Sequence, residues 1–197
     1  MNYLAHFYLS DQTPEGFVGS ILGDFVRGSS YKNFPETIAF EIEMHRKIDS
    51  FTDVHSIVKQ SKRRVSANRG KFAGVLVDMF YDHFFAVNFE TYSQVSLKDF
   101  SAEVYKALHS QQEFLPEDFR RKITSIAEFD LLGSYKTLDG IGLALYRISK
   151  RLKRENNLPE GIFDLKNNYQ ELQNDFKKFF PQLIEFVEKE RKLLLES

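Results

Sequence analysis

Residues 72–89 read FAGVLVDMFYDHFFAVNF, and thirteen of these eighteen residues are apolar. A run of this length that is apolar on nearly every side is typical of a helix buried at the centre of a protein. The alternation of polar and apolar residues that marks half-buried strands is missing throughout the sequence. The sequence therefore predicts an all-α fold with a central helix over residues 71–89.

Further helices are predicted on both sides of this segment from apolar spacing, capping residues and the five prolines. Gly16, Gly19 and Gly23 share a face of the second predicted helix and would let another helix approach closely, and Gly28 is expected to end that helix. The 197 residues contain no recognisable linker or repeat, so we expect one single-domain helical bundle spanning residues 1–197. The expected helical ranges are 4–8, 14–26, 35–51, 54–68, 71–89, one opening at Ser96, 116–131, 134–157, 162–180 and 182–196.

The composition excludes several classes of function. The chain has no cysteine, which rules out thiolate catalysis, cysteine-ligated zinc and disulfides. Its net charge is -1, so the chain as a whole has no bias toward nucleic acid. The first residues lack the pattern of a secretory signal, and the acids within 72–89 make that run a poor membrane span. We expect a cytoplasmic protein that binds neither nucleic acid nor membrane, with its oligomeric state left open.

Three ionisable residues interrupt the central apolar run. Asp78 and Asp82 are four residues apart and share a helix face, and His83 lies about 100° further round. A buried carboxylate must be paired, protonated or bound to a metal, because leaving it unpaired costs several kcal/mol (~3 or more). A salt bridge to Arg27 or Arg46 would satisfy one such group. For an adjacent Asp–His pair, metal ligation is the better explanation.

Two other predicted helices repeat this anomaly. His45, Asp49 and Asp53 follow one another at intervals of four residues, although Asp53 is better explained as a cap of the next helix. Asp24 points where the core residues of its helix point, and Arg27 could neutralise it. Three helices that each turn an acid or an imidazole inward predict one shared polar centre, and helical bundles commonly build metal sites in this way.

The ligand types indicate the chemistry. Oxygen and imidazole ligands without thiolate suit Mn²⁺, Mg²⁺, Fe²⁺ or Zn²⁺. Such an ion lowers the pKa of bound water and polarises a phosphoryl oxygen. Arg27 and Arg46 would then stabilise charge on the phosphate. His6 is interpreted first as a core histidine and second as a further ligand. The residues alone therefore predict a metal-dependent hydrolase of phosphate esters.

Four blocks of sequence carry a resemblance to a known family. They are MNYLAH at 1–6, LGDFVRG at 22–28, MHRKID at 44–49 with Thr52-Asp53 behind it, and DMFYDHF at 78–84. In this order and spacing they resemble the acyl carrier protein phosphodiesterase family, a divergent branch of the HD-type metal phosphohydrolases. The resemblance covers nearly the whole chain.

The resemblance implies an all-helical fold related to HD hydrolases, a manganese-type cofactor and hydrolysis of the phosphodiester that joins 4′-phosphopantetheine to a serine of holo acyl carrier protein. The Asp82-His83 pair is reversed relative to the His-Asp doublet of the wider superfamily, so that superfamily's ligand geometry cannot be copied. The metal ligands that the resemblance implies are Asp24, His45, Asp82 and His83, with Asp49 and Asp78 as reserve ligands or supporting catalytic carboxylates. From the residues themselves, His6 remains an additional candidate ligand, and Arg46 and Arg27 remain candidate catalytic residues.

A basic segment bears on the partner. Residues 59–71 contain six basic residues and no acidic one. Acyl carrier proteins are strongly acidic, so this segment is predicted to dock the substrate; a solvated helix face is the alternative explanation. The residues concerned are Lys59, Lys62, Arg63, Arg64, Arg69 and Lys71.

Two other functions are compatible with these residues. An HD-like phosphohydrolase acting on a nucleotide or another small phosphodiester would use the same metal centre without the basic segment. A non-catalytic helical binding module would use the buried charges only as ion pairs.

Overall fold

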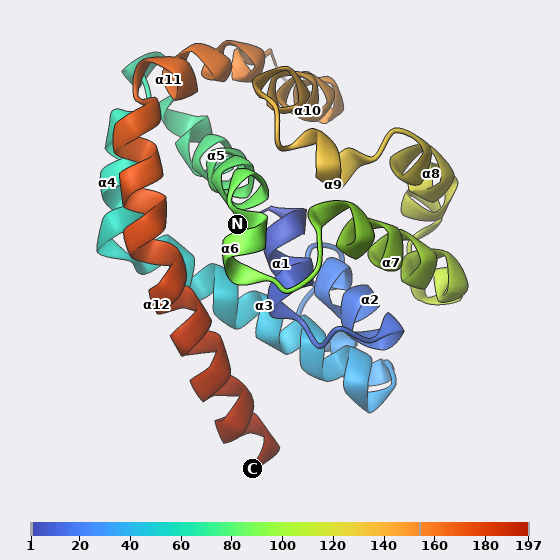
Figure 1. Cartoon of the computed structure of the whole chain (residues 1–197). Coiled ribbons are helices and arrows are strands. Elements are labelled where there is room, and N and C mark those ends of the chain that lie inside the picture. The colour runs from blue at the N-terminus through green and yellow to red at the C-terminus, as the bar shows by residue number, and fades with distance from the viewer. Residues whose placement is uncertain (1, 154, 197) are drawn as a thin grey trace.

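The computed structural model describes residues 2–153 and 155–196, and within them every regular element is a helix (Figure 1). The predicted all-α class is confirmed. Among the described residues, no helix is both long enough and apolar enough to cross a membrane. The α-helices are α1 Tyr3–Leu9, α2 Pro14–Leu22, α3 Glu36–Val54, α4 Ser56–Arg64, α5 Ala73–Val87, α6 Phe89–Tyr92, α7 Leu97–Ser110, α8 Glu117–Glu128, α9 Leu131–Ser134, α10 Leu138–Arg151, α11 Gly161–Asn167 and α12 Tyr169–Leu195, with 3₁₀ turns at Ser30–Asn33, Ala67–Phe72, Gln112–Phe114 and Leu158–Glu160.

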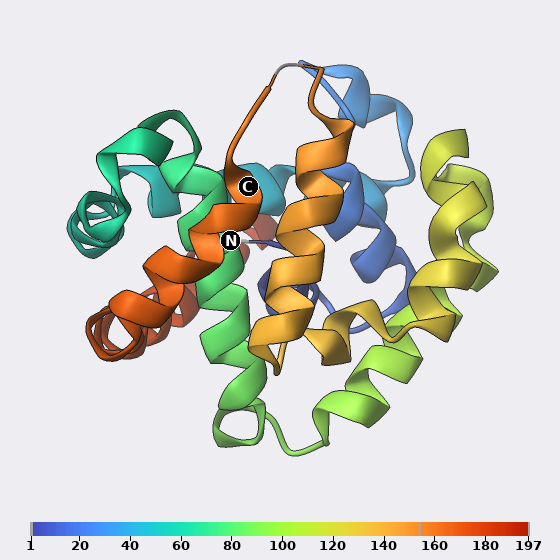
Figure 2. The same ribbon diagram turned by 90° about the horizontal axis from the view of Figure 1, so that it is seen from above.

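Helix α5 is the central helix, as its apolar run predicts. Its side chains are buried on nearly every side, including those of Asp82 and His83. Helices α1, α4, α10 and α12 pack against it, and Figure 2 shows it running between α4 and α12 on one side and α10 on the other. Aromatic rings fill the contacts; those of Phe85 and Phe180, for example, have centroids 4.6 Å apart. The helices thus share one connected hydrophobic core.

Helices α2 and α3 pack closely because α2 presents glycines. A Cβ on Gly19 would lie 2.5 Å from the Cβ of Glu41, and a Cβ on Gly23 would overlap the ring of His45. The predicted close approach of a helix is confirmed at Gly19 and Gly23, whereas a Cβ on Gly16 would meet the backbone of Asp11 ahead of α2. Helix α2 ends at Leu22, however, and not near residue 26. Gly28, with φ +57°, lies in the loop beyond it and does not end the helix.

The longest helix, α12, passes through Pro181, where the sequence predicted a break. Proline removes one backbone N–H and crowds the preceding turn, which disfavours the interior of a helix. Here Phe179, Phe180 and Leu183 are fully buried on both sides of the proline. Burial of these side chains outweighs the local cost, so the predicted break is wrong.

Candidate metal centre

Two histidines and an aspartate meet at the junction of α1 and α3. The Nε2 atom of His6 lies 3.1 Å from Oδ1 of Asp49, and Nε2 of His45 lies 3.2 Å from Oδ2 of the same carboxylate. The two imidazole rings stack with centroids 3.9 Å apart and an angle of 16° between their planes. One ligand atom from each residue lies within 4.8 Å of the others. This cluster could hold one metal ion.

The orientation of His45 is that of a metal ligand. Its Nδ1 atom donates a hydrogen bond to the carbonyl of Ser20 at 2.7 Å. Ligating histidines usually make such a bond with the ring nitrogen that does not bind the metal. Its Nε2 is buried and has no well-aligned hydrogen bond to any described residue. The close approach of Gly23 leaves space for the ring, so α2 helps to set its position.

A second carboxylate, that of Asp24, lies beside this cluster. Asp24 lies in the loop that follows α2, and its Oδ1 is 3.5 Å from Nε2 of His45. Asp24 is half-exposed and faces a pocket of about 230 Å³. Asp49, Asp53 and Asp78 also line this pocket, and its other walls come from Asn2, Thr52, Val75, Met79 and Ile148.

Charge coupling sets the protonation of the cluster. Burial, together with the nearby His45, lowers the pKa of His6 to about 4. Burial also acts to lower the pKa of His45, but the carboxylates of Asp24 and Asp49 outweigh it and raise this pKa to about 9. Burial would raise the pKa of Asp49, yet the two histidines hold it well below its ordinary value. Without a metal at neutral pH, the cluster is therefore one imidazolium, one neutral imidazole and one carboxylate.

The structure places Asp82 outside this cluster, contrary to the ligand set expected from sequence. Its oxygens accept hydrogen bonds from the backbone N–H groups of Asn2, Leu4 and Ala5 at 3.3, 2.9 and 3.4 Å. These amides belong to the first turn of α1, whose own N-cap side chain makes no capping bond. Asp82 therefore anchors the start of the helix that carries His6.

His83 is also placed elsewhere. Its Nδ1 lies 2.8 Å from the carbonyl oxygen of Tyr135, and its Nε2 lies 3.0 Å from the hydroxyl of Tyr169. Both ring nitrogens thus have partners in the protein. Burial lowers the pKa of His83, which favours a neutral ring in these bonds.

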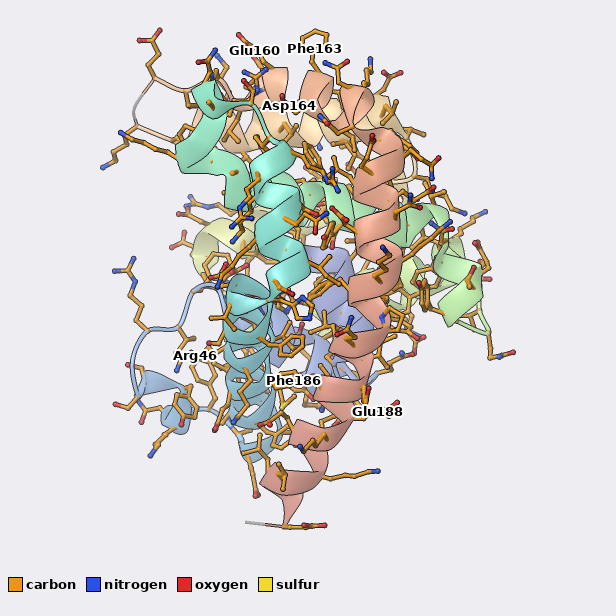
Figure 3. All side chains as sticks on the ribbon, turned by 90° about the vertical axis from the view of Figure 1, so that its left-hand side faces the viewer. Arg46, Glu160, Phe163, Asp164, Phe186 and Glu188 are labelled. Atoms are coloured by element: carbon orange, nitrogen blue, oxygen red, sulfur yellow. The ribbon has the colours of Figure 1, made fainter. Side chains whose placement is uncertain are left out.

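The two arginines expected to bind phosphate do not reach the pocket. Arg46 donates to the carbonyls of Val26 and Gly28, both at 2.8 Å, and its guanidinium lies over the ring of Tyr31. It holds the loop that contains Asp24, on the face shown in Figure 3. Arg27 is exposed and does not line the pocket. Their contact with phosphate, expected from the sequence, therefore stays a prediction that the pocket lining does not support.

The basic segment is only partly available to a partner. Arg69 is buried and makes ion pairs with Asp164 and Glu160, which are labelled at the top of Figure 3. Arg64 pairs with Asp175 of α12 at 2.8 Å. Acids from distant segments thus engage both residues, and their expected docking role stays a prediction.

Four residues of the basic segment still face solvent in whole or in part. Lys62 pairs with Asp53 at the pocket rim at 2.9 Å. Among the described residues, none forms an ion pair with the exposed side chains of Lys59, Arg63 and Lys71.

Asp53 does not cap α4 as expected from the sequence. The side chain of His55 accepts a hydrogen bond from the backbone N–H of Ile57 at the start of that helix instead.

Comparisons with known proteins agree with the resemblance noted in the sequence. The sequence model of the family described as acyl carrier protein phosphodiesterase matches residues 1–183. Similar proteins named acyl carrier protein phosphodiesterase include one from Photorhabdus laumondii, 27% identical over 95% of this chain and 96% of the relative. Others come from Serratia proteamaculans, at 28% over 94% and 96%, and Escherichia coli O6:H1, at 29% over 94% and 96%. No solved structure matches the chain. The chain therefore belongs to the acyl carrier protein phosphodiesterase family.

Proposed function

We propose that this protein is a metal-dependent phosphodiesterase that removes 4′-phosphopantetheine from the serine of holo acyl carrier protein. The observation that carries the proposal is the cluster of His6, His45 and Asp49 beside an acidic pocket, in a chain of this family. Relatives over nearly the full length bear the name of this activity. The single domain over 1–197, the relation to HD hydrolases and the cytoplasmic location remain predictions.

The charge of the pocket supports a role for a cation. Four aspartates line it: Asp24, Asp49, Asp53 and Asp78. An anionic phosphodiester would be repelled by these carboxylates unless a metal ion compensates them. His6, His45 and Asp49 would hold the ion, with Asp24 as a fourth ligand. Nitrogen and oxygen ligands suit Mn²⁺, Mg²⁺, Fe²⁺ and Zn²⁺. We propose Mn²⁺ among them because the family resemblance implies a manganese-type cofactor.

The reaction consumes one water molecule. When bound, the ion supplies a water of lowered pKa and polarises the phosphoryl oxygen. Water adds to phosphorus, the bond from phosphorus to the serine oxygen breaks, and that oxygen takes up a proton. The products are apo carrier protein and 4′-phosphopantetheine. Asp78 lines the pocket, and we propose that it accepts the proton of the attacking water.

Incubation with holo acyl carrier protein and Mn²⁺ tests this function. Intact-protein mass spectrometry should show loss of the 4′-phosphopantetheine mass, and chelation should stop it. If a folded, metal-loaded protein leaves holo carrier protein unchanged but hydrolyses nucleotides or other small phosphodiesters, the alternative function replaces ours. If the protein binds no metal, and neither chelator nor Mn²⁺ changes its stability against unfolding, it is instead a non-catalytic binding module.

Charge reversal on α4 tests the docking surface. Lys59 and Arg63 are exposed and four residues apart, so they share one helix face. The double variant Lys59→Glu, Arg63→Glu should lower kcat/KM for holo carrier protein about tenfold at low salt, because electrostatic attraction speeds association. Activity on bis(4-nitrophenyl) phosphate should be unchanged. The matched control is Lys98→Glu, Lys106→Glu on α7, at the opposite side of the molecule from α4 (Figure 1). Equal losses in the two double variants would contradict docking on α4.

Metal binding is expected to release about one proton. His45, with its pKa raised to about 9, is protonated at neutral pH, whereas His6, with its pKa lowered to about 4, is not. The ion must displace the proton of His45, so Mn²⁺ affinity should rise about tenfold for each pH unit between pH 6 and 8. Calorimetry in two buffers with different ionisation enthalpies measures the release directly. An affinity independent of pH over this window would exclude His45 as a ligand.

A further inference from the structure

A row of cavities leads away from the candidate metal centre. The acidic pocket and a neighbouring cavity of about 60 Å³ share Asn2 and Ile148 in their walls. That cavity shares Tyr3, Leu131 and Arg147 with a third one of about 240 Å³. The two cavities beyond the pocket therefore form a groove, bordered by α1, α8, α9 and α10, that begins at the centre.

The chemistry of the wall changes along this row. The pocket is lined by four carboxylates, but the far end of the groove is mostly apolar. Phe25 and Phe119 meet there edge to face with centroids 5.8 Å apart. Two guanidinium groups, of Arg147 and Arg151, border the groove. Its one acid, Asp118, is engaged by Arg121 at 2.6 Å. The groove thus offers apolar surface and hydrogen-bond donors.

These properties fit one part of the proposed substrate. The pantetheine arm is uncharged and carries a dimethyl group and two amide carbonyls, so it needs apolar walls and donors. The acidic surface of a carrier protein needs the exposed bases of α4 instead. Lys62 of α4 forms an ion pair with Asp53, which lines one side of the pocket. Ile148 of α10 lines the side of the pocket from which the groove begins. Figure 2 shows α4 and α8 on opposite sides of α5 and α10, with α10 on the side of α8.

We propose that the groove between α1, α8, α9 and α10 binds the pantetheine arm while the carrier protein lies on the α4 side, so that the scissile phosphodiester spans the pocket between them. This inference rests on the proposed function. It fixes the orientation of the substrate, with its pantetheine arm toward α10 and its protein part toward α4. Leu131, which lines both cavities of the groove, becomes a specificity-determining residue.

Calorimetric titration of the Mn²⁺-loaded full chain with 4′-phosphopantetheine and with inorganic phosphate tests the groove without turnover. Phosphopantetheine should bind at least about tenfold more tightly than phosphate, because only it has an arm to bury. Leu131→Trp should abolish this difference by filling the groove. Leu143→Trp is the matched control, because Leu143 is exposed on α10 and lines none of the three cavities.

Arg147→Ala provides a second test if Leu131→Trp does not fold, with Lys150→Ala on the same helix as its control. Arg147→Ala should weaken phosphopantetheine binding and leave phosphate binding unchanged. Equal affinity for the two ligands, or unchanged binding in folded groove variants, would overturn the inference. If the arm binds in the groove but holo carrier protein is not hydrolysed, the proposed function fails and the groove stands.

Discussion

Replacing His45 with glutamine is expected to remove Mn²⁺ binding and to lower kcat/KM for holo acyl carrier protein by about 1000-fold. His45 stacks on His6 and contacts the carboxylates of both Asp49 and Asp24. A metal ion contributes several kcal/mol to stabilising a phosphoryl-transfer transition state, and each 1.36 kcal/mol corresponds to a factor of ten. Metal analysis of the purified variant and a mass-spectrometric assay of the product measure the two effects.

His83→Gln is the matched control for this variant. His83 is a buried histidine like His45, and the sequence ranked both as ligands, but the structure bonds both of its ring nitrogens to tyrosine groups. His83→Gln should therefore bind Mn²⁺ with the stoichiometry of the unaltered protein, even if its stability falls. Loss of metal from a folded His83→Gln variant, with metal retained in His45→Gln, would reverse our assignment of the ligands.

The sequence was sufficient to predict the burial and close packing of the helices that contain long apolar runs or a row of glycines. Burial on nearly every side of α5 follows from its composition, and the glycine face of α2 correctly indicated close packing against another helix. The course of α12 through Pro181 could not be predicted. Local propensity disfavours helix at that residue, and only the tertiary burial of Phe179, Phe180 and Leu183 compensates.

The candidate site was predicted less completely, for a different physical reason. Helical spacing places His83 about 100° from Asp82 around the helix axis. Because this helix is buried on every side, the spacing does not reveal which residue each side chain contacts. Asp82 meets backbone amides of α1, and Arg46 meets backbone carbonyls of a loop. A hydrogen bond to a backbone group cannot be predicted from the sequence in this way, because every residue type carries a backbone carbonyl and nearly every one an N–H. His6 was interpreted first as a core histidine, and its own short helix carries no acid and no second histidine that would indicate a metal site.

Asp82→Ala is expected to destabilise the protein and to weaken metal binding together. The carboxylate is fully buried and accepts three backbone N–H groups at the start of α1. Unsatisfied buried donors cost about 1–3 kcal/mol each, and other groups can compensate only in part, so we expect a loss near ~3 kcal/mol at pH 5. His6 lies on the same helix, so its position in the cluster should loosen. Urea denaturation and Mn²⁺ titration measure these effects.

The loss of stability should shrink as the pH rises. Burial raises the pKa of Asp82 to about 7 from an ordinary value of 3.8. Between these values the folded protein binds the proton more tightly than the unfolded chain does. The contribution of this group to stability is thus complete below pH 3.8 and is lost as the pH rises through 7. From the size of the pKa shift, the difference in unfolding free energy between the unaltered protein and Asp82→Ala should be about 2.5 kcal/mol smaller at pH 8 than at pH 5.

Asp82→Asn separates the charge of this residue from its hydrogen bonds. Asparagine keeps one acceptor oxygen and does not ionise, so this variant should be less destabilised than Asp82→Ala, and its difference from Asp82→Ala should not vary between pH 5 and 8. Measurements in the presence of a chelator remove the proton release that accompanies metal binding. The remaining histidines titrate in all three proteins, and comparing the variants cancels their contribution. A destabilisation by Asp82→Ala that grows with pH would show that the ionised carboxylate holds α1 in place, and that burial does not keep Asp82 protonated.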